Sequence, residues 1–437
     1  MSFFFFVILN AIIFIRPAEI FEPLYGIPLY NICVIICFVL TLPNILAQFT
    51  VEKIVSRPIS TCVFSLLPAA ILSHVAHGDA SGVAQALDEY SRLILYWTLL
   101  LGTVTTVGRL RSLIFWVTIS IGVMTLLCLL QYYEVVDIPI LTPILDNDVD
   151  KQTGEMITIL RLQASGLFNN PNAFSRILTI AMLLSFYWMT DPKLRMASPF
   201  WAGMVGMFGY AQFLTKSRGG FLGLLLGVAI LFVSRFGVKR SIPLLAIGLP
   251  VMLALFGGRS TEISVDGGTG QQRVQIWDAG IEALKTTPVF GIGMNNYPEV
   301  AGGYVAHNSL VHCYVELGFL GGTLFTGCFF LSISTLWKLG KASDDIVVPE
   351  LRRMRSFLLA ILSAEAAGMM SISRCYVIPT YLLLGLAAVY FTLLSDDSKV
   401  TLPRLSVRLA GRLFVVSLVL ITVLILYIKV QIRRTGS

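Results

Sequence analysis

Charge is scarce in this chain of 437 residues. Asp, Glu, Lys and Arg make up 13% of it, hydrophobic residues make up 56%, and the mean hydropathy is +0.80. Because ordinary soluble domains carry about 25% charged residues, this composition excludes one. Low-complexity tracts and internal repeats are absent as well. We therefore expect residues 1–437 to form a single helical membrane domain.

Signals of several other protein classes are missing too. The apolar run after Met1 has no basic residues before it and no small-residue cleavage site after it, so we expect no removable signal peptide. The seven cysteines form no CxxC pair and are odd in number, which argues against a disulfide framework or a zinc site. The HExxH motif of zinc enzymes is absent. We expect no metal and no cofactor.

Long apolar segments follow one another along the whole chain. Segments of roughly 17–25 apolar residues can cross a bilayer as helices, so the sequence predicts an all-α polytopic membrane protein with about 12–13 transmembrane helices, several of them short. The expected spans are Phe3–Ile15, Ile27–Phe49, Ile59–Ala76, Leu93–Val107, Leu113–Tyr133, Ala173–Met189, Pro199–Leu214, Gly219–Phe236, Ile242–Phe256, Leu310–Trp337, Phe357–Ile372, Val377–Leu394 and Leu413–Ile428.

The net charge of +7 is unevenly distributed. With the N-terminus in the cytoplasm, more than half of the 32 Lys and Arg residues fall in cytoplasmic connections, as the positive-inside rule requires. This distribution indicates a lipid bilayer and no nucleic acid as the partner. Thirteen spans would place Lys429, Arg433 and Arg434 outside, so the last span or one of the short ones is miscounted.

Two extracytoplasmic loops are long, residues 135–171 and residues 258–308. Apolar residues recur in the second loop at three- and four-residue steps, which predicts a short amphipathic helix over Gln271–Lys285. Thr286-Thr287-Pro288 would end this helix, and a glycine-rich turn follows it. Its apolar face could rest on the bilayer interface.

Basic residues outside gain nothing from the positive-inside rule, so each needs another explanation. Arg218 is the sharpest case, because the short connection Thr215–Gly220 holds its guanidinium at the membrane edge. A guanidinium pairs with phosphate oxygens through two N–H donors and stays charged at any relevant pH. The alternative is an arginine that reaches lipid headgroups. The other outside residues are Arg16, Arg92, Lys151, Arg161, Lys216, Arg259, Arg273, Lys285 and Arg374.

His307 and Asn308 stand where the second loop re-enters the membrane. Imidazole can accept a proton near neutral pH, which favours a catalytic base, although His307 could also be an interfacial residue without chemistry. Asn308 could cap a helix that starts at Ser309. His312 and Glu316, four residues apart, share a helical face and could pair.

Glu365 is an ionisable residue within an expected span. Such a group is costly in the bilayer and usually faces a protein interior or a wet cavity. A transporter could use it as a substrate site near the membrane midplane. A buried partner such as Arg176 would give it a structural role instead.

The order of motifs resembles the O-antigen ligase and polymerase superfamily over about residues 10 to 395. The motifs are Arg16-Pro17, the segment from Arg161 through Gly166 to Asn172, Ser217-Arg218-Gly219-Gly220, Arg273 to Trp277 with Pro288 to Gly293, and His307-Asn308 followed by Glu316-Leu317-Gly318.

The resemblance implies an inverting, metal-independent glycosyltransferase with a GT-C-like membrane fold. Its donor would be an undecaprenyl-diphosphate-linked glycan, and its acceptor a hydroxyl of a glycan or lipid. The protein would be a multi-pass protein of the bacterial inner membrane, with its active site facing the periplasm or cell exterior. Roles transferred by the resemblance are diphosphate binding by Arg218, Arg273 and Arg161, catalysis by His307, and support by Asn172, Asn308 and Glu316.

Three functions remain open from the sequence. A ligase would attach a finished polysaccharide to an acceptor, whereas a polymerase of the same superfamily would join O-antigen or exopolysaccharide repeat units. A membrane solute transporter is the alternative from another class. The clustering of basic groups at one face, away from mid-depth, favours an enzyme.

Overall fold

The computed structural model of the protein describes residues 1–149, 156–255, 269–397 and 400–435. The chain divides into two compact units. Unit 1 contains Met1–Asn44, Gly102–Ile263 and Val348–Gly368, and unit 2 contains Ile45–Leu101, Ser264–Val347 and Met369–Ser437. Each unit is therefore assembled from segments far apart in the sequence. The single helical domain expected over residues 1–437 stays a prediction.

The described residues are mostly helical, and eight of their helices are long and apolar enough to cross a membrane. These eight are Ser2–Ile20, which joins α1 (Ser2–Ile15) to α2 (Pro17–Ile20), α3 (Leu29–Leu46), α5 (Pro58–Val75), α7 (Val107–Tyr132), α10 (Arg218–Phe236), α14 (Ser309–Lys338), Ile378–Ser395 of α16 (Ile378–Asp397) and Val407–Arg433 of α17 (Val407–Thr435). A ninth span results if α8 (Pro171–Met189) and the following segment Pro192–Leu214, bent by 113°, count as one. The prediction of an all-α polytopic membrane protein is confirmed.

Other predicted spans fall in helices that do not meet the same criterion. Two of them, α6 (Ala80–Thr103) and α15 (Pro349–Gly368), carry several charged residues along their length. The remaining helices are α4 (Val51–Ser56), α9 (Ser198–Thr215), α11 (Val238–Leu255), α12 (Thr269–Thr286) and α13 (Tyr297–Val300), with short 3-10 helices at Glu22–Leu24, Pro139–Leu141, Gly166–Phe168, Pro192–Ala197, Ser343–Asp345 and Met369–Ser371.

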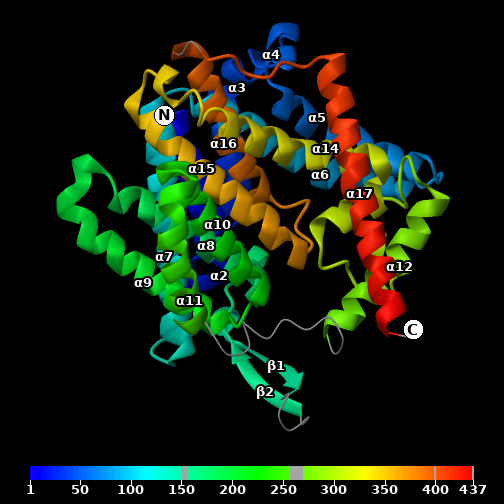
Figure 1. The fold of residues 1–437 in the computed structure, drawn as a ribbon, viewed down its shortest axis with the longest axis horizontal. Coiled ribbons are helices and arrows are strands. Elements are labelled where there is room, and N and C mark those ends of the chain that lie inside the picture. The colour runs from blue at the N-terminus through cyan, green and yellow to red at the C-terminus, as the bar shows by residue number, and fades with distance from the viewer. Residues whose placement is uncertain (150–155, 256–268, 398–399, 436–437) are drawn as a thin grey trace. The chain divides into compact units, whose positions relative to one another are not determined.

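Unit 1 is a helical bundle in which α10 packs on α8 and α15 (Figure 1). Glycines make this packing close: a Cβ added at Gly223 or Gly227 of α10 would lie 3.0 Å from Ala364 of α15. Small residues at such positions let helix backbones approach each other where the surrounding lipid is as apolar as the side chains. The bundle thus fixes how the N-terminus of α10, which begins at Arg218, stands beside α8.

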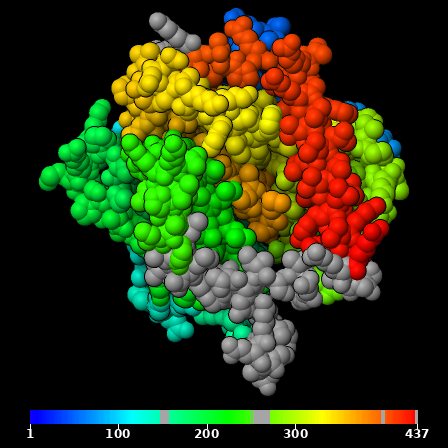
Figure 2. Space-filling view, viewed as in Figure 1, coloured from blue at the N-terminus to red at the C-terminus, as the bar shows by residue number. Residues whose placement is uncertain are grey.

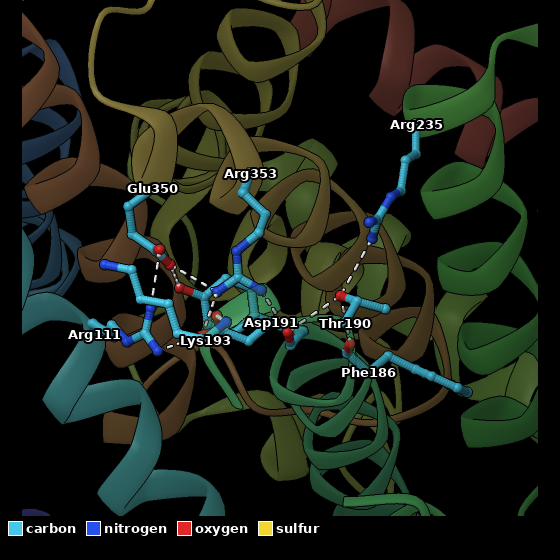
Figure 3. A network of polar contacts seen from close by, with 9 residues as sticks. Arg111, Phe186, Thr190, Asp191, Lys193, Arg235, Glu350 and Arg353 are labelled. Carbon is cyan, nitrogen blue, oxygen red and sulfur yellow. Dashed lines mark hydrogen bonds and ion pairs between the residues drawn. The ribbon is translucent and has the colours of Figure 1, made fainter. Parts of the chain in front are cut away.

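Ion pairs gather at one end of this bundle. Figure 3 shows Arg111 of α7, Asp191 after α8, and Glu350 and Arg353 of α15 directed toward one another. Arg353 lies 2.8 Å from Glu350 and 3.2 Å from Asp191, and Arg111 lies 3.0 Å from Glu350. All four residues belong to connections predicted to be cytoplasmic or flank them. The helix ends that bear Asn172 and Arg218 are therefore at the opposite end of unit 1.

A β-hairpin interrupts the predicted all-α pattern within the loop 135–171. Strands β1 (Ile144–Val149) and β2 (Met156–Arg161) pair antiparallel, with Ile144 opposite Arg161 (Figure 1). The segment from Met156 to Leu160 is rich in β-branched residues, which suit a strand. The hairpin ends at Arg161, so it delivers this side chain to the bundle.

Unit 2 contains α12, whose bounds resemble the helix expected over Gln271–Lys285. Its apolar side chains, including Val274, Ile281 and Leu284, are buried in a core shared with α14 and with Ile421 and Leu424 of α17. This face is therefore covered by protein, and the suggestion that it rests on the bilayer interface is wrong. Side chains on the other side of α17, including Phe414, Leu418 and Leu426, are exposed, and this helix is drawn in red in Figure 2.

Helix α14 is broken at Gly318, whose φ of 65° departs from the helical value. The break frees backbone groups that the segment after α12 pairs: Ile292 N donates to Val315 O at 3.0 Å, Gly293 N to Glu316 O at 3.0 Å, and Phe319 N to Pro288 O at 2.8 Å. Two motifs singled out in the sequence, Pro288 to Gly293 and Glu316 to Gly318, are thus hydrogen-bonded partners.

Candidate functional site

Arg161 is the centre of a polar group in unit 1. Its Nη1 lies 2.6 Å from Asp146 Oδ2, its Nε donates to Thr215 O at 2.9 Å, and its Nη2 donates to Asn172 Oδ1 at 3.1 Å. The residue is 8% exposed. Protein groups thus engage all three guanidinium nitrogens, and the side chain joins the hairpin to the start of α8 and the end of α9.

Arg218 begins α10 beside this group. Ser217 caps the helix, because its Oγ accepts from Gly220 N at 3.3 Å, and the same Oγ donates to Asn172 Oδ1 at 2.8 Å. A Cβ added at Gly220 would lie 1.7 Å from Ser175 Oγ, so the glycine permits the close approach of α8. The half-buried Arg218 therefore stands at a fixed, positively polarised helix N-terminus, which favours an anion.

Arg16 lies close to the same motif in unit 1. A Cβ added at Gly166, whose φ is +55°, would lie 1.7 Å from Arg16 Nη1. Only glycine lets the guanidinium pass this close to the backbone. Arg16 also pairs with Glu19 one helical turn further on. Two of the motifs that carried the family resemblance, Arg16-Pro17 and Arg161 to Asn172, are thus neighbours in space.

His307 and Asn308 form the entry to α14 in unit 2. Asn308 is the N-cap that the sequence suggested: its Oδ1 accepts from Leu310 N at 3.0 Å and from Val311 N at 3.2 Å. His307 has a φ of 48°, a left-handed conformation that is uncommon for a residue with a side chain. Such strained residues cluster at functional sites. The half-buried His307 thus directly precedes a capped helix start, with its backbone in a defined left-handed conformation.

Burial lowers the pKa of His307, and the nearby charges of Arg273, Arg374 and His312 lower it further. A guanidinium repels an imidazolium but not a neutral imidazole. His307 is therefore kept neutral near physiological pH, in the form that can accept a proton.

Arg273 is brought toward this entry by α12. Trp277, one helical turn further along the same face, donates from Nε1 to Ala306 O at 2.5 Å. Ala306 directly precedes His307. The hydrogen bond therefore fixes the face of α12 that bears Arg273 against the residues that bear His307.

Arg374 is a further cation at the entry. Ser309, the first residue of α14, donates to Ile372 O at 2.6 Å and accepts from Arg374 N at 2.8 Å, so it fixes the segment that bears Arg374 beside His307. The sequence placed Arg374 among the outside basic residues but gave it no role, because it lies 66 positions after Asn308. Its position outside and directly after an expected span was the available signal.

His312 and Glu316 pair one turn deeper in α14, as their four-residue spacing predicts. His312 Nε2 lies 3.0 Å from Glu316 Oε1, and its Nδ1 lies 2.9 Å from Ser373 Oγ. The fully buried carboxylate also accepts from Tyr297 N at 3.1 Å, and the Tyr297 ring stacks on His312 with centroids 5.3 Å apart. This pair stabilises the start of α14, because it links α14 to the segments that bear Tyr297 and Ser373.

Two further predictions from the sequence concern Arg259 and a metal site. Arg259 lies outside the described residues. Among the residues that the structure describes, no group of three or more His, Cys, Asp or Glu side chains could hold a metal ion.

Comparison with known protein families gives a match to the central part of the chain. Residues 202–326 match the family model described as O-antigen ligase. This segment is therefore similar to an O-antigen ligase domain. The resemblance inferred from the order of motifs is thereby confirmed at the level of the superfamily. No curated protein matches the chain.

The O-antigen ligase segment contains Arg218, Arg273, His307, Asn308 and Glu316. Arg161 and Asn172 precede it, and Arg374 follows it. The match and the many apolar helices together make the protein a multi-pass membrane enzyme of polysaccharide biosynthesis.

Proposed function

We propose that this O-antigen ligase relative transfers a glycan from an undecaprenyl-diphosphate carrier to an acceptor hydroxyl, with inversion and without a metal ion. The acceptor is a glycan or lipid at the periplasmic face of the bacterial inner membrane. The family match and the arrangement around His307 support this proposal.

The observation that carries the proposal is the position of His307 beside Arg273 and Arg374 at the start of α14, where burial and these charges lower its pKa. An attacking hydroxyl needs a base within hydrogen-bond reach, and an imidazole with a lowered pKa remains available for that role. Departure of the lipid diphosphate develops negative charge on its oxygens. Fixed guanidinium groups stabilise such charge without reorganisation.

In this mechanism, His307 accepts the proton of the acceptor hydroxyl as the hydroxyl oxygen attacks the anomeric carbon from the face opposite the diphosphate. The bond from that carbon to the diphosphate oxygen breaks, and the undecaprenyl diphosphate leaves with the electron pair. Arg273 holds diphosphate oxygens, and Arg374 adds a cation near His307. Asn308 and Glu316 fix the segment that bears the base.

For unit 1 we propose a division of roles. Arg218, half-buried at the N-terminus of α10, binds the diphosphate directly. Arg161, originally expected to do the same, already donates to Asp146, Thr215 and Asn172. It therefore acts as a positioning residue that holds the connection before Arg218, and Asn172 shares this role through Ser217.

Purified protein in liposomes, supplied with an undecaprenyl-diphosphate glycan and acceptor in the presence of EDTA, tests the proposal. Wild type should form product, and His307→Ala and Arg218→Ala should reduce its rate by at least about a hundredfold, the scale of lost base or oxyanion stabilisation. Arg92→Ala is the matched control, because the side chain of this outside arginine is 63% exposed and pairs with Asp88 one helical turn away. Full activity of both site variants would refute the assignment.

The product pattern separates the two enzymes of this superfamily. Addition of one block per acceptor supports the ligase, whereas a ladder of increasing length shows a repeat-unit polymerase. The transporter alternative loses its main support in the structure, because Glu365 lies 3.2 Å from the buried Arg176 within unit 1.

A further inference from the structure

A cavity of about 660 Å³ opens in unit 2, away from His307 in the sequence and outside the proposed reaction. Its walls come from α4, the first turn of α5, the last turns of α16 and the linker before α17. Leu405 N donates to Val55 O at 2.7 Å, which closes the linker onto α4.

The cavity lies where three candidate membrane spans begin or end. Helix α5 starts at Pro58, the apolar part of α16 ends at Ser395, and the apolar part of α17 starts at Val407. Both connections that line the cavity are predicted to be cytoplasmic from their Lys and Arg content. An occupant would therefore be located at the membrane surface on the cytoplasmic side.

The charge of the described lining residues is mainly positive. Lys53, Arg57 and Arg404 are cationic, and Glu52 is the anionic residue among them. Lys53 Nζ donates to Ala47 O at 2.6 Å, and Arg57 donates to Gln48, so both cations are held in place by local contacts. The exposed Arg404 extends from the linker. This arrangement favours an anion.

The walls also include apolar and hydroxyl groups. Ile59, Ser60 and Ala388 are buried in the cavity wall, and Phe391 and Thr392 are half-buried beside them. A small soluble anion would use the cations alone. A lipid would use both surfaces, with its phosphate among the cations and the first carbons of its chains against the apolar wall.

We propose that this cavity binds the phosphate headgroup of an anionic membrane lipid. Basic pockets between transmembrane helices on the cytoplasmic side suit such headgroups, because cations near this leaflet are attracted to anionic lipid. The bound headgroup contacts α4, α5 and the linker that precedes α17, and so holds these elements together. Since α17 covers α12, the occupied cavity stabilises the helix that bears Arg273.

Native mass spectrometry of the full protein from micelles, titrated with phosphatidylglycerol or phosphatidylcholine, tests this proposal. Wild type should retain phosphatidylglycerol in preference, and Lys53→Gln/Arg404→Gln should weaken this retention by about tenfold or more. Arg57 is left unchanged because it precedes α5 and bonds Gln48. The matched control is Arg408→Gln/Arg412→Gln, which removes two exposed cations of α17 that do not line the cavity.

The proposal requires that retention of phosphatidylglycerol falls in Lys53→Gln/Arg404→Gln and not in the control variant. Equal losses in both double variants, or none in either, would overturn it, because binding would then follow net charge and not the cavity. Displacement of the lipid by millimolar inorganic phosphate would also overturn it in favour of a soluble anion. Circular dichroism of both variants confirms that each is folded, and a single variant, Arg404→Gln, should give a partial loss if the double variant does not fold.

Discussion

Replacing Glu365 of α15 with leucine would leave the Arg176 guanidinium of α8 without the carboxylate that faces it inside unit 1. The two side chains are 6% and 0% exposed, and Arg176 Nη1 lies 3.2 Å from Glu365 Oε1. At an effective dielectric constant of about 20, two unit charges at this distance attract by about 5 kcal/mol. Most of this attraction only offsets the removal of both charges from water.

The net value of the pair is therefore small, although the cost of breaking it is large. Glu365→Leu should lower the free energy of unfolding by about 3–5 kcal/mol, because an uncompensated buried charge remains. Arg176→Met should cost a similar amount. The double variant Arg176→Met/Glu365→Leu removes both charges and should recover most of the loss, since a matched apolar pair is often as stable as a buried ion pair.

Thermal and denaturant unfolding of the four proteins in one detergent, analysed as a double-mutant cycle, measures the coupling. Glycan transfer is measured on the folded fraction in parallel and should change little. Equal stability of Glu365→Leu and wild type, or a double variant no more stable than the single ones, would refute the reasoning. Loss of solute uptake in vesicles of Glu365→Gln, with uptake unaffected in His307→Ala, would instead support a transporter.

Three further predictions concern unit 2. Arg374→Gln removes a cation that disfavours the imidazolium, so the pKa of His307 should rise and the acid limb of the transfer rate should move to higher pH; an unchanged limb, as expected for Arg92→Gln, would contradict this. Asn308→Ala should cost about 1 kcal/mol of stability through loss of the α14 cap, and Asn308→Asp should restore it, as measured by thermal unfolding. Gly318→Ala should abolish folded yield in size-exclusion chromatography, because its φ is +65° and its Cβ would lie 2.2 Å from Val289 O, whereas Gly411→Ala, with nothing within 4 Å, should be tolerated.

Local patterns of the sequence were sufficient for several features. Asn308 caps α14 and His312 pairs with Glu316, because both interactions span four residues or fewer and depend only on helix geometry. The ion pair between Arg176 and Glu365 was also anticipated, since a charged residue in a span needs a partner and few were available.

Other features depend on segments that are far apart in the chain. The three partners of Arg161, which favour a positioning role over direct diphosphate binding, come from the hairpin, α8 and α9. The cover of α17 over the apolar face of α12 also escaped prediction, because an amphipathic periodicity indicates a buried face but not whether lipid or protein buries it.

The sequence by itself determined that this protein is a helical membrane protein and an O-antigen ligase relative. Long apolar segments can satisfy their backbone hydrogen bonds in a bilayer only as helices or closed barrels, and their length favours helices. The order of the motifs indicated the resemblance to this superfamily. Tertiary structure decided which arginines are engaged by protein groups and which stand near His307, because a guanidinium's role depends on the groups around it. Ser309, which fixes Arg374 beside His307, shows that those groups come from distant segments of the chain.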